Sequence, residues 1–317
     1  MTKTSTTKER TRVVGYALVA FAALLWALLG VFSKNLLAAG VGPTEIAFWR
    51  AAIGGALFVV HAMVEGSLRL QRRSDALAFV AFALVGVTLF YTALNIAIEA
   101  GGVSLAFILL YSAPAFVAVL AALLLGERLT RLKGLLVAVA VVGVALVAQG
   151  GESGMTVSFR SVSWGLIAGA SYASYYLFGK WILRRYRPAT IYAFVMPLGA
   201  LGLLPFTPFA AVKHATLEIW LYLVLMSVLS TYAAYLVYYT GLKRVEASRA
   251  VLVATIEPVV AAALAAWLFG ERLGTLGILG GALVVGAAML SALPERGRRS
   301  RAHEPVGADP GVDDLVR

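Results

Sequence analysis

The sequence contains no cysteine and few charged residues. The absence of cysteine excludes disulfide bonds, thiolate metal sites and cysteine nucleophiles. Only 14% of the 317 residues are charged, whereas 61% are hydrophobic, more than a soluble domain can keep away from water. Lipid is therefore the predicted solvent for most of the chain. The net charge of +11 does not indicate nucleic-acid binding, because the basic residues form short clusters between apolar stretches.

Apolar segments of about 18–24 residues recur along the chain, and this is the length that a membrane-spanning helix needs. Unpaired backbone groups are not tolerated in hydrocarbon, so these segments are predicted to be helices. The expected fold is an all-α integral membrane protein with ten transmembrane helices. The predicted spans are 13–33, 44–64, 76–98, 103–125, 132–149, 162–182, 189–208, 218–241, 247–269 and 274–293.

The distribution of lysine and arginine predicts the orientation of these spans. If residues 1–12 form a cytoplasmic tail, the inner segments hold 22 of the 27 basic residues and the outer segments hold four. The remaining one, Arg50, lies inside the span 44–64. The positive-inside rule then predicts a multi-pass protein of the cell membrane with both termini cytoplasmic. Residues 13–33 are expected to be an uncleaved signal anchor, and residues 294–317 a disordered cytoplasmic tail.

The sequence also contains an internal repeat. Residues 114–129 read PAFVAVLAALLLGERL, and residues 258–273 read PVVAAALAAWLFGERL. The prolines and the Gly-Glu-Arg-Leu motifs recur at an offset of 144 residues, and Tyr91 matches Tyr235 at the same offset. Near the start of each copy, Lys34 matches Lys180 at a slightly different offset. The chain is therefore predicted to consist of two copies of one unit.

The two copies are assigned to residues 13–149 and 162–293, joined by an outer linker at 150–161. Each copy contains five predicted spans, and five is an odd number, so the second copy must lie upside down in the membrane. Inverted repeats are typical of transporters, because exchanging the conformations of the two halves switches access between the two sides. The alternative is a duplication that only builds a stable bundle.

Several of these features resemble the EamA domain of the drug/metabolite transporter superfamily. They are the two P-x11-G-E-R-L motifs, the five-plus-five spans and the Phe48-Trp49-Arg50 element, and the resemblance covers about residues 13–293. It implies a basket-like bundle with a substrate cavity between the halves. It also implies secondary transport, usually export, of amino acids, nucleobase-like compounds or other small metabolites. The second copy lacks the arginine, because Val195 or Met196 stands at the matching position.

Glu257 is the acidic residue that we expect to act in transport. It precedes Pro258 within a predicted span, where a charged side chain costs on the order of 2–3 kcal/mol or more. Such a residue is a candidate for proton coupling or for binding a substrate amine. The alternative is a carboxyl that bonds a backbone carbonyl freed by Pro258. Pro114 and Pro258 occupy matching positions and are expected to kink their spans and to act as hinges for gating.

Polar and aromatic residues are expected to line the cavity beside Glu257. Thr88, Tyr91 and Asn95 are spaced three and four residues apart, which predicts one helix face. Aromatic rings hold organic substrates by apolar contact and cations by their faces, although tyrosines also form interfacial belts. The predicted substrate site comprises Trp26, Thr88, Tyr91, Asn95, Tyr111, Tyr172, Tyr176, Tyr235, Tyr238 and Glu257.

Arg50 is assigned a structural or gating role, with three alternatives for its partner. It could extend to the outer surface, pair with Glu99, or bind a substrate carboxylate. One arginine and one acid suit a zwitterion, so amino acids are the leading guess for the substrate.

The predicted function is therefore secondary active export of small metabolites by alternating access, with the proton gradient as the driving force. The sequence lacks a G-x4-G-K-[ST] motif, so ATP hydrolysis is not predicted. It also lacks a nucleophile–base pair among the spans, so an enzyme is not expected. The alternatives are a non-transporting membrane partner or sensor, and a membrane-embedded enzyme. The expected partners are a small-molecule substrate and the lipid bilayer, with no nucleic acid, cofactor or metal. The sequence is compatible with a monomer.

Overall fold

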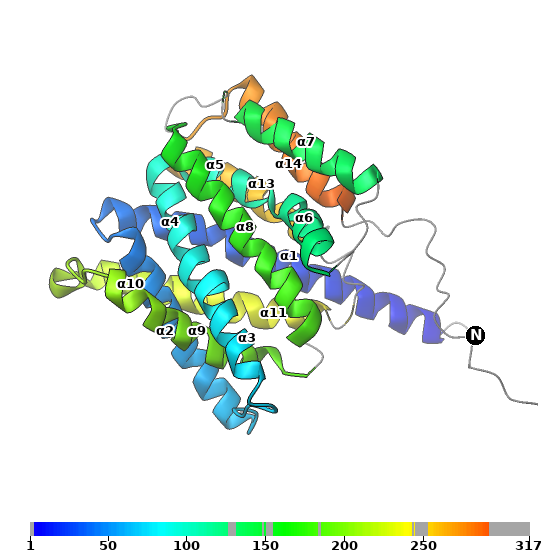
Figure 1. Cartoon of the computed structure of the whole chain (residues 1–317), viewed down its shortest axis with the longest axis vertical. Coiled ribbons are helices and arrows are strands. Elements are labelled where there is room, and N and C mark those ends of the chain that lie inside the picture. The colour runs from blue at the N-terminus through cyan, green and yellow to red at the C-terminus, as the bar shows by residue number, and fades with distance from the viewer. Residues whose placement is uncertain are drawn as a thin grey trace, which may run out of the picture.

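The structure is a computed structural model that describes residues 3–125, 131–147, 149, 155–182, 185–242, 244 and 253–291. The described residues are predominantly helical (Figure 1). The first Gly-Glu-Arg-Leu motif, at 126–129, and the predicted tail at 294–317 lie outside these residues. The elements are α1 (Lys3–Ala38), α2 (Pro43–Val64), α3 (Asp75–Phe82), η1 (Ala83–Leu89), α4 (Phe90–Gly101), α5 (Val103–Leu110), α6 (Ala113–Leu125), α7 (Arg131–Val147), α8 (Phe159–Ile182), α9 (Pro188–Leu203), η2 (Leu204–Phe206), η3 (Val212–His214), α10 (Leu217–Ser227), η4 (Val228–Ala233), α11 (Ala234–Leu242), α13 (Ile256–Phe269) and α14 (Thr275–Ser291).

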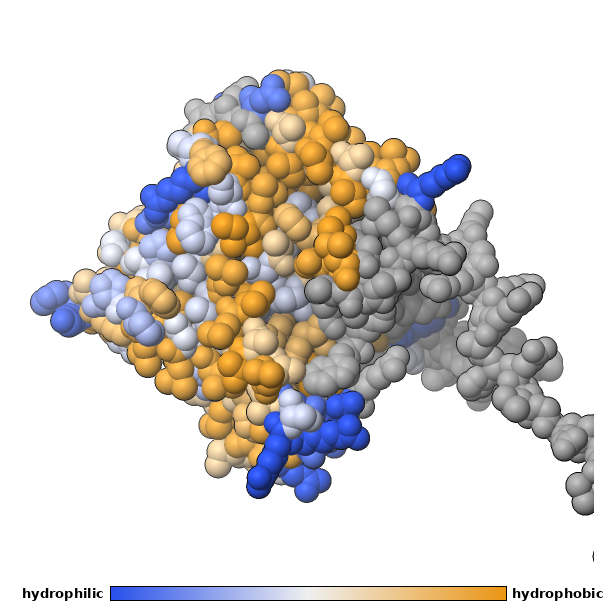
Figure 2. All heavy atoms as spheres, in the orientation of Figure 1, coloured by the Kyte–Doolittle hydropathy of each residue, from blue (hydrophilic) through white to orange (hydrophobic). Residues whose placement is uncertain are grey.

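The helices have the length and the surface of a multi-pass membrane protein. Five of them are long and apolar enough to cross a membrane: Thr11–Ala38, Pro43–Val64, Asp75–Gly101, Pro188–Phe206 and Leu217–Leu242. Four shorter apolar helices accompany them, so the count of ten spans stays a prediction. Large apolar side chains such as Leu123 and Trp267 are exposed, and Figure 2 shows a hydrophobic band between hydrophilic groups at its upper-left and lower edges. α1 begins at Lys3, within the stretch predicted to be a tail.

The helix pairs follow the internal repeat. α4 packs on α8 and its copy α11 packs on α1; likewise α6 packs on α8 and α13 packs on α1. The two copies thus exchange their first helices, which gives one bundle of α4, α5, α6 and α8 and another of α1, α11 and α13. We call these the α8 bundle and the α1 bundle. The remaining pairs each join a helix to its own copy, α2 with α9 and α7 with α14 (Figure 1).

Two of the predicted spans are broken near their middle. The turn at Tyr111–Ser112 separates α5 from α6, and a turn at Thr255 precedes α13. Pro114 is the second residue of α6, and Pro258 is the third residue of α13. Backbone N–H groups in the first turn of a helix make no hydrogen bond within that helix. A proline in the first turn, which lacks this N–H, therefore leaves no helical carbonyl oxygen without a partner. Pro114 and Pro258 were expected to kink continuous helices. Each lies instead in the first turn of a new helix that starts after a break.

Two π-helical segments also occupy matching positions in the repeat. η1 spans Ala83–Leu89 and η4 spans Val228–Ala233, and the offset of 144 residues maps 84–89 onto 228–233. A π segment holds more residues per turn than an α-helix, so it rotates the side chains that precede it relative to those that follow. Residues three or four apart across a π segment therefore do not share the helix face that the α-helical period predicts.

Candidate substrate site

Arg50 lies at the centre of the candidate site, where α2 meets α4 and η4. Its side chain is only 3% exposed. Nε donates a hydrogen bond of 2.9 Å to Oγ1 of Thr231, and the guanidinium carbon lies 3.8 Å from the centre of the Tyr91 ring. Arg50 therefore does not extend to the surface. It does not pair with Glu99 either, because that carboxylate accepts a 2.7 Å bond from Arg160 at the protein surface.

Several buried polar atoms on α2, α4 and η4, the elements that meet at Arg50, have no hydrogen-bond partner. Among the described side chains they are Nε1 of Trp49, Nη1 of Arg50 itself, the hydroxyls of Tyr91, Thr92 and Ser230, and Oδ1 of Asn95. Buried polar groups in folded proteins are nearly always hydrogen-bonded, so a cluster of unpaired ones requires an explanation. A ligand that supplies the missing partners is one.

Glu257 lies where the two helix breaks meet. Its carboxylate is buried in the first turn of α13, and Oε2 accepts a 2.8 Å hydrogen bond from the hydroxyl of Tyr111. The same hydroxyl lies 2.9 Å from the carbonyl oxygen of Ala254. Tyr111 belongs to the break in the first copy and Glu257 to the break in the second. Both breaks therefore contribute to one buried polar site.

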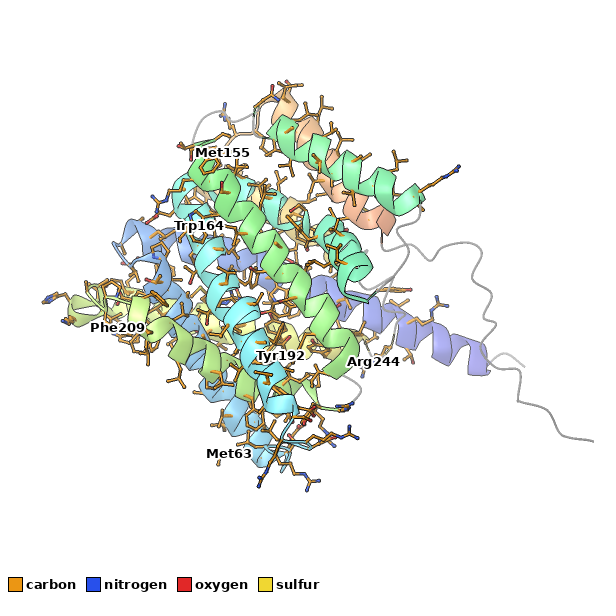
Figure 3. The ribbon with its side chains drawn as sticks, in the orientation of Figure 1. Met63, Met155, Trp164, Tyr192, Phe209 and Arg244 are labelled. Carbon is orange, nitrogen blue, oxygen red and sulfur yellow. The ribbon has the colours of Figure 1, made fainter. Side chains whose placement is uncertain are left out.

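Aromatic side chains of α1, α8, α9 and α11 form a cluster of their own. The Trp26 ring lies 5.6 Å from Tyr235 and 5.2 Å from Tyr238, centre to centre. Tyr192, which is labelled in Figure 3, is buried and lies 4.4 Å from Tyr235. Tyr175 packs against the buried cluster that contains Tyr192 and Tyr235, and its hydroxyl donates a 2.7 Å bond to the carbonyl of Gly86 in η1. The aromatic cluster thus connects the α1 bundle to the α8 bundle.

The predicted site residues do not all come together. The centre of the Tyr172 ring lies 5.5 Å from the centre of the Phe90 ring and 5.6 Å from that of Tyr175. Thr88 faces elsewhere, because its hydroxyl donates a 2.8 Å bond to the carbonyl of Gly199 on α9. Thr88 lies in η1, where the wider turn rotates it away from the face that Tyr91 shares with Asn95. The side chains of Tyr176 and Pro114 lie outside the described part of the structure.

The predicted substrate site does not include three residues that the structure brings here, Tyr175, Tyr192 and Thr231. Tyr175 follows Tyr172 by three residues, so helical spacing provided a signal for it. Thr231 precedes Tyr235 by four residues and had the same kind of signal. Tyr192 had no local signal, because its contact with Tyr235 involves helices far apart in sequence. Across residues 3–125, 131–147, 155–182, 185–242 and 253–291, no group of three or more His, Asp or Glu side chains is arranged to hold a metal ion.

Comparison with known proteins identifies the family. The profile of the EamA-like transporter family matches residues 13–149 and again residues 159–293. The chain belongs to the EamA-like transporter family. The two matched regions are the two copies of the repeat, and the second begins three residues before the predicted boundary at 162.

Relatives of this EamA-family chain are named as transporters. An "Uncharacterized transporter" of Archaeoglobus fulgidus is 28% identical over 77% of this chain and 87% of its own length. The "Uncharacterized inner membrane transporter YicL" of Salmonella typhimurium is 26% identical over 90% of this chain and 96% of its own. A "Probable terminal-alkyne amino-acid exporter" of Streptantibioticus cattleyicolor is 30% identical over 84% and 89%. A solved structure matches with a TM-score of 0.59 at 21% identity, covering 89% of this chain and 96% of that one, which supports the fold.

Proposed function

We propose that this EamA-family protein is a secondary active transporter that exports small amino acids or related metabolites across the cell membrane by alternating access. The observation that carries the proposal is the contact between Tyr111 and Glu257, which joins the two helix breaks in a buried polar site. Transporters with inverted repeats commonly form their substrate sites from discontinuous helices near the membrane midplane. Matched breaks in a two-copy membrane fold support the same arrangement here.

Amino acids are proposed as the substrate class for two reasons. The buried site contains one cation, Arg50, and one acid, Glu257, which complement the two charges of a zwitterion. The relative from Streptantibioticus cattleyicolor, named as an amino-acid exporter, supports the same class and the direction of transport. The aromatic rings of Trp26 and Tyr235 supply apolar surface for a small uncharged side chain. Glu257 is the proposed site of proton coupling, because a buried carboxyl in a membrane protein typically serves ion or proton movement.

Counterflow into proteoliposomes tests the proposal. Vesicles are loaded with unlabelled small neutral amino acids, including one with a terminal alkyne, and the uptake of the labelled compound is measured. The wild-type protein is expected to accumulate label. Tyr235→Ala removes the ring that contacts both Trp26 and Tyr192, and is expected to lower the initial rate by roughly tenfold, equivalent to about 1.4 kcal/mol.

The matched control is Tyr222→Ala, which removes a tyrosine ring that packs on Phe32 away from the site, and should retain most of the uptake. If folded wild-type protein moves none of a broad panel of amino acids, nucleobases and sugars, the transport proposal is wrong. A non-transporting partner or sensor then becomes the better account.

A further inference from the structure

Arg50 carries a positive charge that its described partners do not neutralise. Thr231 and the Tyr91 ring, the two groups that contact its guanidinium, are both neutral. No ion pair joins Arg50 to a described carboxylate, and the carboxylate of Glu257 accepts its hydrogen bond from Tyr111 instead. Desolvating a guanidinium without a counter-charge is costly, and the cost is largest in a membrane interior. A protein retains such a group where a ligand or a conformational change supplies the missing charge.

Three of the unpaired groups on α2, α4 and η4 are suited to an anion. Nη1 of Arg50 is a donor by chemistry, and the hydroxyls of Tyr91 and Ser230 can donate. Ser230 adjoins Thr231, which already accepts from Arg50, and the Tyr91 ring lies directly against the guanidinium. The guanidinium is therefore held at Nε by Thr231 and on one face by the Tyr91 ring, while Nη1 has no hydrogen-bond partner and can donate to a ligand. This is the geometry in which arginine binds a carboxylate through two parallel hydrogen bonds.

Resting on the proposed function, we infer that Arg50, Tyr91 and Ser230 form a subsite for the carboxylate of the transported molecule. Arg50 is then a substrate-binding residue and not only a structural one. Glu257 and Tyr111 form the opposite pole, which faces the substrate ammonium group. The substrate class that fits both poles is a small zwitterion with a free carboxylate.

A set of three matched compounds tests the carboxylate subsite. They are a small neutral amino acid, its primary amide and the corresponding amine without the carboxyl group. Each competes with the labelled amino acid in counterflow. The wild-type protein is expected to bind the amino acid at least about tenfold more tightly than its amide, because only the carboxylate forms the charge-assisted pair with Arg50.

Variants of Arg50 separate recognition from folding. In Arg50→Gln, the preference for the acid over the amide is expected to fall to about one, while Arg50→Lys keeps part of it, since lysine retains the charge without the planar fork. Arg160→Gln, which removes an exposed arginine on the outer surface, is the control and should leave the ratio unchanged. If both Arg50 variants reduce uptake but keep the wild-type acid-to-amide ratio, the subsite is wrong and Arg50 is structural. Absence of wild-type flux for every compound overturns the proposed function instead.

A second, independent observation concerns the Gly-Glu-Arg-Leu motif at the end of α13. Gly270 has a φ of +66°, a left-handed conformation that ends the helix and turns the next residue back towards the bundle. The carboxylate of that residue, Glu271, is fully buried and accepts hydrogen bonds from the backbone nitrogens of Val103 at 2.9 Å and Ser104 at 2.8 Å. Lys34 forms an ion pair with it.

These contacts join the two bundles at one end of the molecule. Lys34 comes from α1 and Glu271 follows α13, so both belong to the α1 bundle, whereas Val103 and Ser104 begin α5 of the α8 bundle. A carboxylate at a helix N-terminus bonds free N–H groups and interacts favourably with the helix dipole. Gly102 permits the close approach, because a side chain there would lie 2.8 Å from the Glu271 carboxylate.

We propose that Glu271 and Lys34 form a latch that holds the bundles together at this end, which the charge distribution predicts to face outside. Opening of the site to that side requires the N-terminus of α5 to leave the Glu271 carboxylate. Glu271→Ala removes both the charge and the acceptor, Glu271→Gln keeps an acceptor, and Lys34→Gln removes only the ion pair. The latch is therefore expected to weaken most in the alanine variant.

The absence of native cysteine allows a direct test by labelling. Ala106→Cys places a thiol on α5 at a position that is fully buried. Its reaction with a membrane-impermeant thiol reagent in intact cells reports opening to the outside. Glu271→Ala is expected to raise the labelling rate by roughly tenfold or more, and Lys34→Gln by less. Glu99→Gln, which removes another outer carboxylate, is the control. An unchanged labelling rate in correctly folded Glu271→Ala protein overturns the latch and leaves a static helix cap.

Discussion

The most informative residue is Tyr111, because a single hydroxyl connects the two copies of the repeat. It donates to Glu257 from the break between α5 and α6, and both groups are buried. Hydrogen bonds to a charged group contribute about 1.5–3 kcal/mol, more than neutral ones. The position of the proposed proton-carrying carboxylate therefore depends on one bond.

Tyr111→Phe is expected to lower the counterflow rate by roughly tenfold, because the ring is kept while the bond that positions Glu257 is lost. Tyr222→Phe removes a tyrosine hydroxyl away from the site and should leave the rate unchanged. A Tyr111→Phe protein that transports at the wild-type rate would contradict the role given to this contact.

The burial of single residues was predictable from the sequence. Glu257 and Tyr235 are polar or aromatic groups inside apolar segments, and both are buried, Glu257 at a helix break and Tyr235 among aromatic rings. The surroundings of Arg50 were not predictable. Its contact with Thr231 crosses 181 residues of sequence, and such a contact leaves no local periodic signal. The same holds for Glu271, whose partners at the start of α5 lie 167 and 168 residues away.

At the scale of helices, α7 and α14 form a pair that depends on glycine. A β-carbon on Gly280 would lie 2.5 Å from the carbonyl oxygen of Gly143 and 2.7 Å from the backbone nitrogen of Val147. These are backbone atoms, which cannot rotate away as a side chain can. Small residues at such contacts allow membrane helices to pack closely.

Gly280→Val is therefore expected to force the two helices apart and to lower the melting temperature in detergent by several degrees, from a loss of about 1–3 kcal/mol by overpacking. Gly286→Val is the matched control on the same helix, because a β-carbon there meets nothing within 4 Å. Equal melting temperatures for the two variants would contradict the close contact.

Sequence periodicity located most of the described helices to within a few residues, and their interruptions only in part. The length of an apolar run indicates the length of the helix that it forms. Pro114 and Pro258 marked the two predicted spans that the structure shows to be broken. The π segments were not foreseen, because an extra residue in a helical turn leaves the composition of a span unchanged. The prediction that Thr88 shares a face with Tyr91 failed for that reason, since Thr88 bonds to α9 instead.

At the scale of the whole molecule, the exchange of first helices between the copies makes the two bundles interdependent. α1 belongs to the first copy but packs with α11 and α13 of the second, and α8 does the reverse. In the proposed alternating access, movement of one bundle against the other would therefore involve both copies equally.

Inversion of the repeat predicts that the two Gly-Glu-Arg-Leu motifs lie on opposite sides of the membrane. In the cysteine-free chain, Arg272→Cys should react with an impermeant thiol reagent in intact cells, whereas Arg128→Cys should react only after the membrane is permeabilised. Reaction of both from the same side would contradict the inversion.

The central claim is that one buried polar site opens in turn to each side of the membrane. Ser230→Cys tests it most directly, because Ser230 is fully buried and adjoins the residue that binds Arg50. The account predicts that an impermeant thiol reagent reaches this cysteine from the outside of intact cells and, separately, from the inside of inverted vesicles. It also predicts that a transported amino acid slows both reactions. Labelling confined to one side under every condition, with or without substrate, would contradict alternating access.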